Sequence, residues 1–213
     1  MRFFKYSLTS LLMTILSACQ GFNASTDTLG VVFSTALNSS NTTYVPGFEY
    51  IEVELNGKKA ALALGYRKVN GVDTEEHWYS GVGEMLTLRN GRLVEVLGMT
   101  SEVRQTSREI PKWDQLEVNQ SPLTWMRTRN LHPGYRYGVK EYVTSEVKVN
   151  IQEDRQANQT WVYENVQSER ADGREWRYKE KFQLENGRVV FSEQCLTPSI
   201  CFKLKPLGVV VKQ

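Results

Sequence analysis

Cys19 is the residue whose type and setting point most directly to chemistry. It follows Leu16-Ser17-Ala18, and these four residues form the lipobox on which the bacterial lipoprotein pathway acts. The small side chains at 17 and 18 fit a peptidase cleft, and the Cys19 thiol accepts a diacylglycerol before cleavage makes it the first residue. We therefore predict that Cys19 is the lipid attachment site and carries acyl chains of the palmitate type.

The residues before Cys19 have the pattern of a secretory signal peptide. Arg2 and Lys5 form a positive start, and the apolar run from Tyr6 to Leu16 follows. That run has about eleven residues, whereas a membrane-spanning helix needs about twenty. We predict that residues 1–18 are removed. Gln20, in place of Asp, favours transfer to the outer membrane, with the folded part on the periplasmic face.

The net positive charge of the chain, +2, lies in this leader. Two of the 26 basic residues and none of the 24 acidic residues lie in residues 1–18, so the remaining 195 residues are formally neutral. Binding to nucleic acid needs a clear excess of positive charge, so we expect no nucleic-acid partner. A length of 195 residues suits one domain.

Cys195 and Cys201 are the other two cysteines, and they enclose the sequence CLTPSIC. The oxidising compartment and the even number favour a disulfide, which would contribute about 2 kcal/mol by closing a short loop. A metal site is less favoured because no His or third Cys is near. A free pair is the third alternative, if Pro198 holds the two ends apart.

Residues for catalysis or metal binding do not form a recognisable motif. His77 and His132 are 55 residues apart and show no metalloprotease spacing. Glu52 and Glu54 share one face of a strand about 7 Å apart, so a glycan-modifying enzyme stays open as an alternative. That face is more simply the solvated side of the strand. We expect a protein that is not an enzyme and has no cofactor or metal.

The aromatic residues are the remaining candidates for binding. Trp113, Trp125 and the nearby Arg127 lie in an irregular segment, residues 101–134, which we interpret as a long connection with one or two short strands. Such segments often carry binding residues, so these three are predicted to contact a glycan or a partner protein. Packing is the alternative. Trp161 and Trp176 lie in strand-like runs and are expected in the core.

Hydrophobic periodicity separates a short helix from a long β region. Leu29, Val32, Phe33, Ala36 and Leu37 are spaced for one apolar helix face. From residue 48 the period becomes two, and Asn-Gly or Asp-Gly pairs interrupt the strand-like runs. We predict an all-β fold: a large antiparallel meander sheet partly curled on itself, with one short N-terminal helix. Residues 19–47 would be the lipid-anchored tether and helix, and residues 48–213 one β domain.

One short sequence occurs twice. Leu88-Arg-Asn-Gly-Arg92-Leu-Val resembles Leu184-Glu-Asn-Gly-Arg188-Val-Val, and a tryptophan precedes each copy. Either a sheet unit is duplicated, or two hairpins use the same favoured turn.

With these residues in view, the chain resembles the YjbF/GfcB lipoproteins of bacterial exopolysaccharide and group 4 capsule loci. The resemblance is spread over nearly the whole length: the lipobox at Cys19, Ala63-Leu64-Gly65-Tyr66, Trp78 followed by MLTLRNGRLVEV, Trp125-Met-Arg127, Trp161-Val-Tyr-Glu164, and Trp176 followed by NGRVV and Lys203-Leu-Lys-Pro206. It implies an all-β domain that acts in polysaccharide secretion beside an outer-membrane β-barrel of the YjbH/GfcD type.

Two functions follow as hypotheses. The first is an outer-membrane-anchored periplasmic lipoprotein that assists exopolysaccharide or capsule export or assembly without catalysis. Its partners would be the membrane through the lipid on Cys19, the β-barrel and polysaccharide. The alternative is a carrier of lipid or another hydrophobic ligand, with an open curled sheet around the ligand.

Overall fold

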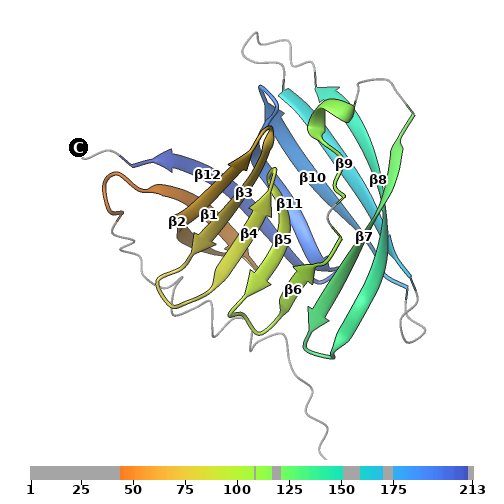
Figure 1. Cartoon of the computed structure of the whole chain (residues 1–213), viewed down its shortest axis with the longest axis horizontal. Coiled ribbons are helices and arrows are strands. Elements are labelled where there is room, and N and C mark those ends of the chain that lie inside the picture. The colour runs from red at the N-terminus through yellow and green to blue at the C-terminus, as the bar shows by residue number, and fades with distance from the viewer. Residues whose placement is uncertain (1–43, 108, 117–120, 151–158, 170–174, 211–213) are drawn as a thin grey trace, which may run out of the picture.

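The structure is a computed structural model, and it describes residues 44–107, 109–116, 121–150, 159–169 and 175–210. These residues form twelve strands and one short 3-10 helix, η1 (Figure 1). In chain order they are β1 (Glu49–Leu55), β2 (Lys58–Asn70), β3 (Asp73–Tyr79), β4 (Met85–Arg89), β5 (Arg92–Leu97), β6 (Glu102–Gln105), η1 (Trp113–Gln115), β7 (Leu123–His132), β8 (Arg136–Asn150), β9 (Gln159–Ser168), β10 (Arg177–Glu185), β11 (Arg188–Thr197) and β12 (Ile200–Val209).

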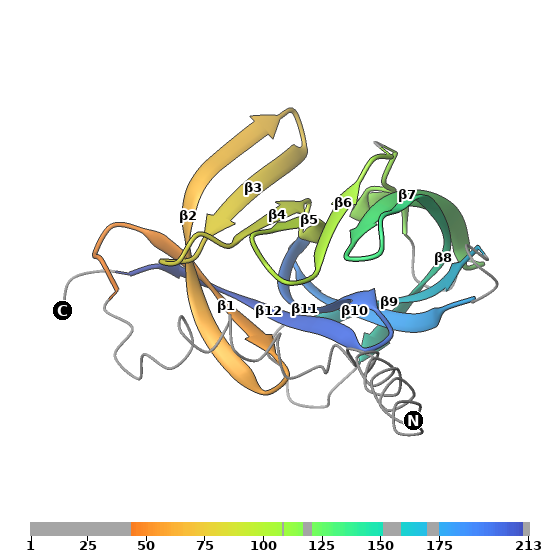
Figure 2. The ribbon, with the colours of Figure 1, turned by 90° about the horizontal axis from the view of Figure 1, so that it is seen from below.

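The strands form one closed antiparallel barrel. Each strand pairs with its neighbours in the chain, and β12 returns to pair with β1, so that the meander closes (Figures 1 and 2). The all-β antiparallel meander predicted from the sequence is confirmed, and the curling goes as far as closure. The predicted helix at 29–37 lies outside the described residues. Among the residues that the structure describes, no helix is long and apolar enough to cross a membrane.

Asn-Gly pairs make three of the tight turns. Asn56, Asn90 and Asn186 have φ of 53°, 51° and 51°, and the glycine after each also has a positive φ. This left-handed backbone matches the twist of the two strands that the turn joins, and Asn and Gly adopt it at little cost. The hairpins predicted at these pairs are present as β1–β2, β4–β5 and β10–β11.

The repeated sequence corresponds to two hairpins with the same irregularity. The pairing register shifts between Thr87 and Leu88 in β4–β5, and between Gln183 and Leu184 in β10–β11. The shift therefore falls at the same place relative to Asn-Gly in both hairpins. The two hairpins also approach each other, because a side chain added at Gly91 would meet Val189 at 2.5 Å.

Two sequence interpretations of strands need correction. Residues 101–134 are not mainly a connection, because β7 is a full ten-residue strand of the barrel wall beside the short β6. In addition, β3 was not predicted, since its sequence DTEEHWY is mostly polar. Only Trp78 is buried in this strand, so its inward face carries almost no hydrophobic pattern.

The interior of the barrel has two parts, which differ in the side chains that pack them. The apolar half is lined mainly by β1–β6 and β12, and its largest buried side chains include Ile51, Leu86 and Phe202. The charged half is lined mainly by β7–β10, where arginine and glutamate side chains are fully buried. Gln194 on β11 lies between the halves. Its amide accepts from the Leu93 backbone N–H at 2.6 Å and donates to the Gly91 carbonyl at 2.9 Å.

Candidate functional site

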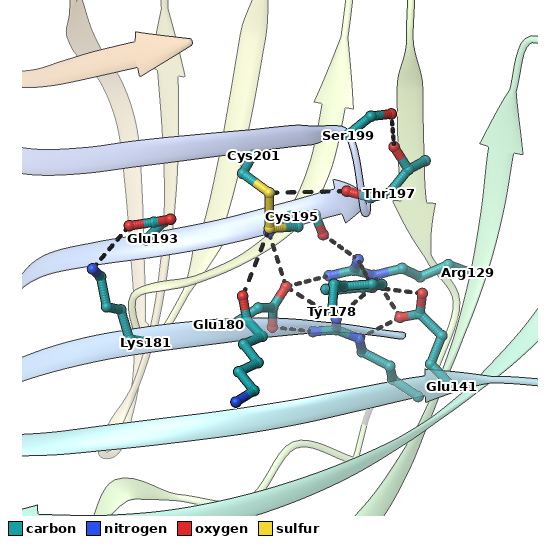
Figure 3. Close-up of a disulfide and its surroundings, with 12 residues drawn as sticks. Arg129, Glu141, Tyr178, Glu180, Lys181, Glu193, Cys195, Thr197, Ser199 and Cys201 are labelled. Atoms are coloured by element: carbon teal, nitrogen blue, oxygen red, sulfur yellow. Dashed lines mark hydrogen bonds and ion pairs between the residues drawn. A yellow bond between two sulfur atoms is a disulfide. The ribbon is translucent and has the colours of Figure 1, made fainter. Parts of the chain in front are cut away.

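The predicted disulfide is present. Cys195 on β11 and Cys201 on β12 are direct cross-strand partners, and their sulfur atoms are bonded. Cys195 is buried above the charged half of the barrel (Figure 3). Its backbone N–H donates to Glu180 Oε1 at 3.1 Å, and its carbonyl accepts from Arg129 Nη1 at 2.9 Å. The disulfide therefore fixes a backbone segment of β11 that borders a buried ionic cluster.

Arg127 lies at the centre of that cluster and not on a surface loop. It belongs to β7, and only 1% of the residue is exposed. The expectation of an accessible cation in an irregular segment is wrong. Strand alternation turns Arg127 to the inner face, as it does Arg129 two residues later. In this structure the Arg127 guanidinium cannot reach a glycan or a partner at the surface.

We call Arg127, Arg129, Glu141, Tyr178 and Glu180 the central cluster. Arg127 forms a bidentate ion pair with Glu180: its Nη1 donates to Oε2 at 3.0 Å, and its Nη2 donates to Oε1 at 3.1 Å. Its Nε donates to Glu141 Oε2 at 2.6 Å. Tyr178 donates its hydroxyl to Glu141 Oε1 at 2.6 Å and accepts from both arginines at 3.1 and 3.3 Å. These contacts join β7, β8 and β10 across the barrel interior.

The pKa values of three members of the central cluster, Glu141, Arg127 and Tyr178, are shifted in the direction that preserves their usual charge states. Burial raises the pKa of Glu141, but the positive charges of Arg129 and Arg127 outweigh burial, and the net pKa lies below the ordinary glutamate value. Burial lowers the pKa of Arg127, and Glu180 leads the groups that raise it well above its ordinary value. Burial raises the pKa of Tyr178, so its hydroxyl keeps its proton. Glu141, Arg127 and Tyr178 are therefore not proton donors or acceptors poised near neutral pH, and the two arginines of the cluster face two glutamates.

A second ion pair lies further along the same half. Arg92 on β5 donates to Glu164 on β9 at 2.8 Å, and both side chains are buried. Its guanidinium lies 3.4 Å from the ring centroid of Trp113, which belongs to η1. Ser145 donates to the same Glu164 oxygen at 3.0 Å and accepts from the indole N–H of Trp125 at 3.0 Å.

The two predicted tryptophans therefore face this buried pair. Trp113 is half-buried and donates its indole N–H to the Asn90 carbonyl at 2.7 Å. Trp125 is half-buried against Val143 and Tyr178 on the inner side. Packing, the alternative weighed from the sequence, describes both positions. Contact of these indoles with a glycan or partner stays a prediction.

The interior chemistry does not favour a carrier of acyl chains. The two ion-pair groups place three guanidinium groups and three carboxylates inside the charged half. An acyl chain entering there would separate charges that are buried from water, and leaving such charges unpaired costs several kcal/mol. In the apolar half the inward side chains pack on one another as a continuous core.

Glu52 and Glu54 lie on the outer face of β1, as the alternation predicts. Glu52 pairs with Lys59 at 2.9 Å, and Glu54 pairs with Lys203 at 2.7 Å. The hydrogen bond from Lys203 lowers the pKa of Glu54, which is unfavourable for the general acid of a glycosidase. A groove of about 480 Å³ runs beside them over β1, β12, β11 and β10.

One arrangement has the order of a catalytic triad and was not predicted. The two ring nitrogens of His77 each lie 3.3 Å from an oxygen, of Glu75 on one side and of Thr87 on the other. Thr87 is only 3% exposed, and its hydroxyl also lies 3.3 Å from Glu95. A nucleophile must reach its substrate, so this buried hydroxyl does not form a working site. His132 is remote from this group and packs against Tyr135 and Tyr137.

The fold and the interior together define a class: a closed antiparallel barrel whose buried charges hold the wall together, with polar grooves on its outer face. Residues 46–203 match the family described as "Group 4 capsule polysaccharide lipoprotein gfcB, YjbF". Because this match covers more than half of the chain, the protein belongs to that family of capsule-locus lipoproteins, and it is a membrane-anchored protein of the cell envelope.

The fold is also similar to a solved structure. The crystal structure of the hypothetical lipoprotein YmcC from Escherichia coli (K12) matches with a TM-score of 0.63 and 18% sequence identity, and the match covers 84% of this chain and 96% of that chain. At this identity the likeness shows the fold alone. No match was found among curated proteins.

Proposed function

We propose that this protein is an outer-membrane lipoprotein that assists the export or assembly of a surface polysaccharide without catalysing a reaction. The observation that carries the proposal is membership of the capsule-locus family over residues 46–203. The lipobox at Cys19 supports the anchor, and Gln20 after it supports transfer to the outer membrane.

A non-catalytic role is supported by how the reactive groups are used. The carboxylates of Glu52 and Glu54 are paired with lysines, and the Thr87 hydroxyl near His77 is buried. The interior carboxylates Glu141 and Glu180 are bound by arginines. None of these groups is both accessible and unpaired, which is what acid–base or nucleophilic catalysis needs.

The closed barrel limits how a partner can bind. In the part of the chain that the structure describes, every strand has a neighbour on both sides, but the pairing is incomplete: residues 123–127 of β7 have no backbone partner on β6, and residues 64–70 of β2 have none on β1. Apart from these short edges, a partner must recognise side chains on the outer face or in the loops. We propose an outer-membrane β-barrel of the YjbH/GfcD type as this partner.

The decisive experiment is a clean chromosomal deletion with complementation. Deletion is expected to reduce surface polysaccharide, measured by uronic-acid or total-sugar assay of washed cells, and the wild-type chain should restore it. The purified lipoprotein should not hydrolyse this polysaccharide, because the groups described above are not arranged for acid–base or nucleophilic catalysis. Normal polysaccharide in the deletion strain would refute the accessory role.

The anchor is tested separately. Changing Cys19→Ser removes the acyl acceptor, and we expect the protein to leave the outer-membrane fraction and to lose labelling by radioactive palmitate. Unchanged fractionation of this variant would contradict the lipid anchor. Site-specific photocrosslinking in cells, followed by mass spectrometry of the captured band, tests whether a β-barrel of the proposed type lies beside the domain.

A further inference from the structure

A continuous row of polar side chains crosses the outer face of seven neighbouring strands. Each member is the cross-strand partner of the next. Going from β8 through β12 and β1 to β2, the members are Glu146, Tyr163, Lys181, Glu193, Lys203, Glu54 and Lys59. Neighbouring charges are joined, with Lys181 bound to Glu193 at 3.0 Å and Lys203 to Glu54 at 2.7 Å. The row is thus an ordered surface of alternating charge.

The next row holds two aromatic rings with an amide between them. Gln183 on β10 is the register partner of Trp161 on β9 and of Phe191 on β11. The centroids of the Trp161 and Phe191 rings are 6.2 Å apart, and Tyr163 stacks beside Trp161 at 6.4 Å. We call Trp161, Gln183 and Phe191 the outer platform. The sequence interpretation of Trp161 as a core residue is wrong, since it is the outward neighbour of buried Val162.

The outer platform continues into the groove beside Glu52 and Glu54. Gln183 and Phe191 line this groove together with Lys203 and Lys205. Its volume of about 480 Å³ lies within the roughly 300–1,000 Å³ of small-molecule sites. Aromatic rings, a planar amide and charged groups therefore meet on one accessible surface.

This combination fits a sugar chain. A pyranose ring has an apolar C–H face that can lie on an aromatic ring, and a rim of hydroxyls that both donate and accept hydrogen bonds. Gln183 offers a donor and an acceptor, lysine ammonium groups donate, and carboxylates accept. Since each lysine in the row already has a carboxylate partner, these polar groups are held in place before a ligand arrives.

Other ligand classes fit less well. The groove is lined by the lysines Lys59, Lys203 and Lys205 and by the glutamates Glu52, Glu54 and Glu185, so its formal charge is zero. A polyanion held by its charge would meet as much repulsion as attraction. The centre of a protein–protein interface is depleted of charged residues, whereas this groove is lined by six of them.

We propose that the outer platform and its groove bind a polysaccharide chain through stacking on Trp161 and Phe191 and hydrogen bonds to Gln183. The inference rests on the proposed function for the choice of sugar. It moves the glycan contact from the inner side of the barrel, where Arg127 lies, to the outer face of β9–β11.

The test is calorimetric titration of the full-length lipoprotein in detergent micelles. The probe is a set of oligosaccharides released by mild acid from the surface polysaccharide of the producing cells. Trp161→Ala is expected to weaken binding about tenfold and Phe191→Ala about fivefold, as for truncated aromatic anchors in other interfaces. Trp161→Phe, which keeps a ring, should bind more tightly than Trp161→Ala.

The matched control is Tyr137→Ala, which removes an exposed ring from β8 outside the outer platform and should leave affinity unchanged. Unfolding temperatures of all variants verify that the barrel is intact. Binding should also persist in about 1 M salt, where the Debye length is about 3 Å, because stacking and hydrogen bonds carry it.

Two results would overturn the inference. One is a wild-type chain that binds none of the oligosaccharides, and the other is equal affinity in the wild type, Trp161→Ala and Phe191→Ala. Either result leaves the accessory role standing if the deletion strain still lacks polysaccharide. Failure of the accessory role is recognised differently, by normal polysaccharide in the deletion strain.

Discussion

The two halves of the barrel reach the same burial by opposite chemistry. In the apolar half, side chains such as Val53, Leu86 and Phe202 are fully buried and need no specific partner. In the charged half, Arg127, Arg129 and Glu141 are equally buried, but each depends on oppositely charged groups from other strands.

The comparison teaches where the barrel is tolerant and where it is specific. An apolar core accepts many side chains of similar volume, because dispersion and the hydrophobic effect are not directional. A buried ion pair requires definite atoms at definite distances, and losing one member leaves the other unpaired. We therefore expect the charged half to specify the register among β7, β8 and β10, and the apolar half to supply bulk stability.

Arg127→Met should give the largest effect. It leaves Glu141 and Glu180 buried without their central partner, and breaking a buried pair costs about 3–5 kcal/mol. Urea unfolding followed by circular dichroism measures the loss. The control is a double variant that also has Glu180→Leu, in which the remaining buried charges, Arg129 and Glu141, are matched. If this double variant is no more stable than the single one, stranded charge is not the cause.

Leu204→Ala tests the apolar half by the same measurement. Leu204 on β12 is 1% exposed, and truncation of such a leucine costs about 2–5 kcal/mol through lost burial and a cavity. We expect the loss of unfolding free energy to be somewhat smaller than the loss for Arg127→Met. No change of a charged partner should restore it, because the loss is one of volume. A loss under about 1 kcal/mol would mean that this half is loosely packed.

Removal of the disulfide should have a smaller effect. Cys195→Ser with Cys201→Ser opens a short loop, which corresponds to about 2 kcal/mol of chain entropy. Because Cys195 also binds Glu180 and Arg129 through its backbone, we expect the loss to be felt mainly in the charged half. Hydrogen exchange should show greater opening of β10–β11 than of β1–β2. Equal opening in both hairpins would contradict this link.

Mild acid should have the smallest effect. The pKa of Glu141 is lower in the folded chain than its ordinary value of 4.5, so its contribution to stability is complete above that pH and is lost as the pH falls through the folded value. Going from pH 7 to about 4.5 reaches only the beginning of this loss. Urea midpoints should fall less with acid in Glu141→Gln than in the wild type. Parallel acid profiles for the two proteins would argue against Glu141 as a contributor.

Much of the fold could be predicted from the residues. The alternation of Ile51, Val53 and Leu55 with Glu52 and Glu54 predicts a strand with one face inward, and that is how β1 lies. Asn-Gly pairs predict hairpins because few other residues accept their backbone angles. The pair Cys195 and Cys201 predicts a bridge from compartment and spacing, and the bridge is present.

The buried charges left a signal that was overlooked. Glu141 lies between Val139 and Val143, and Glu164 lies between Val162 and Val166. With a period of two, a glutamate flanked in this way shares the inward face of its valines. The same spacing could have placed Arg127 and Arg129 inside, since Leu131 follows at the same interval.

Local pattern by itself determined most of the strands, the tight turns at Asn-Gly and the cysteine pair, because each depends on residues close together in the chain, and the composition gave the neutral charge after the leader. Only the tertiary structure decided that the sheet closes and which charges meet. Arg92 and Glu164 are 72 residues apart, and Arg127 and Glu180 are 53 apart. Such contacts depend on the register and curvature of many strands at once, and alternation within one strand carries no information about them.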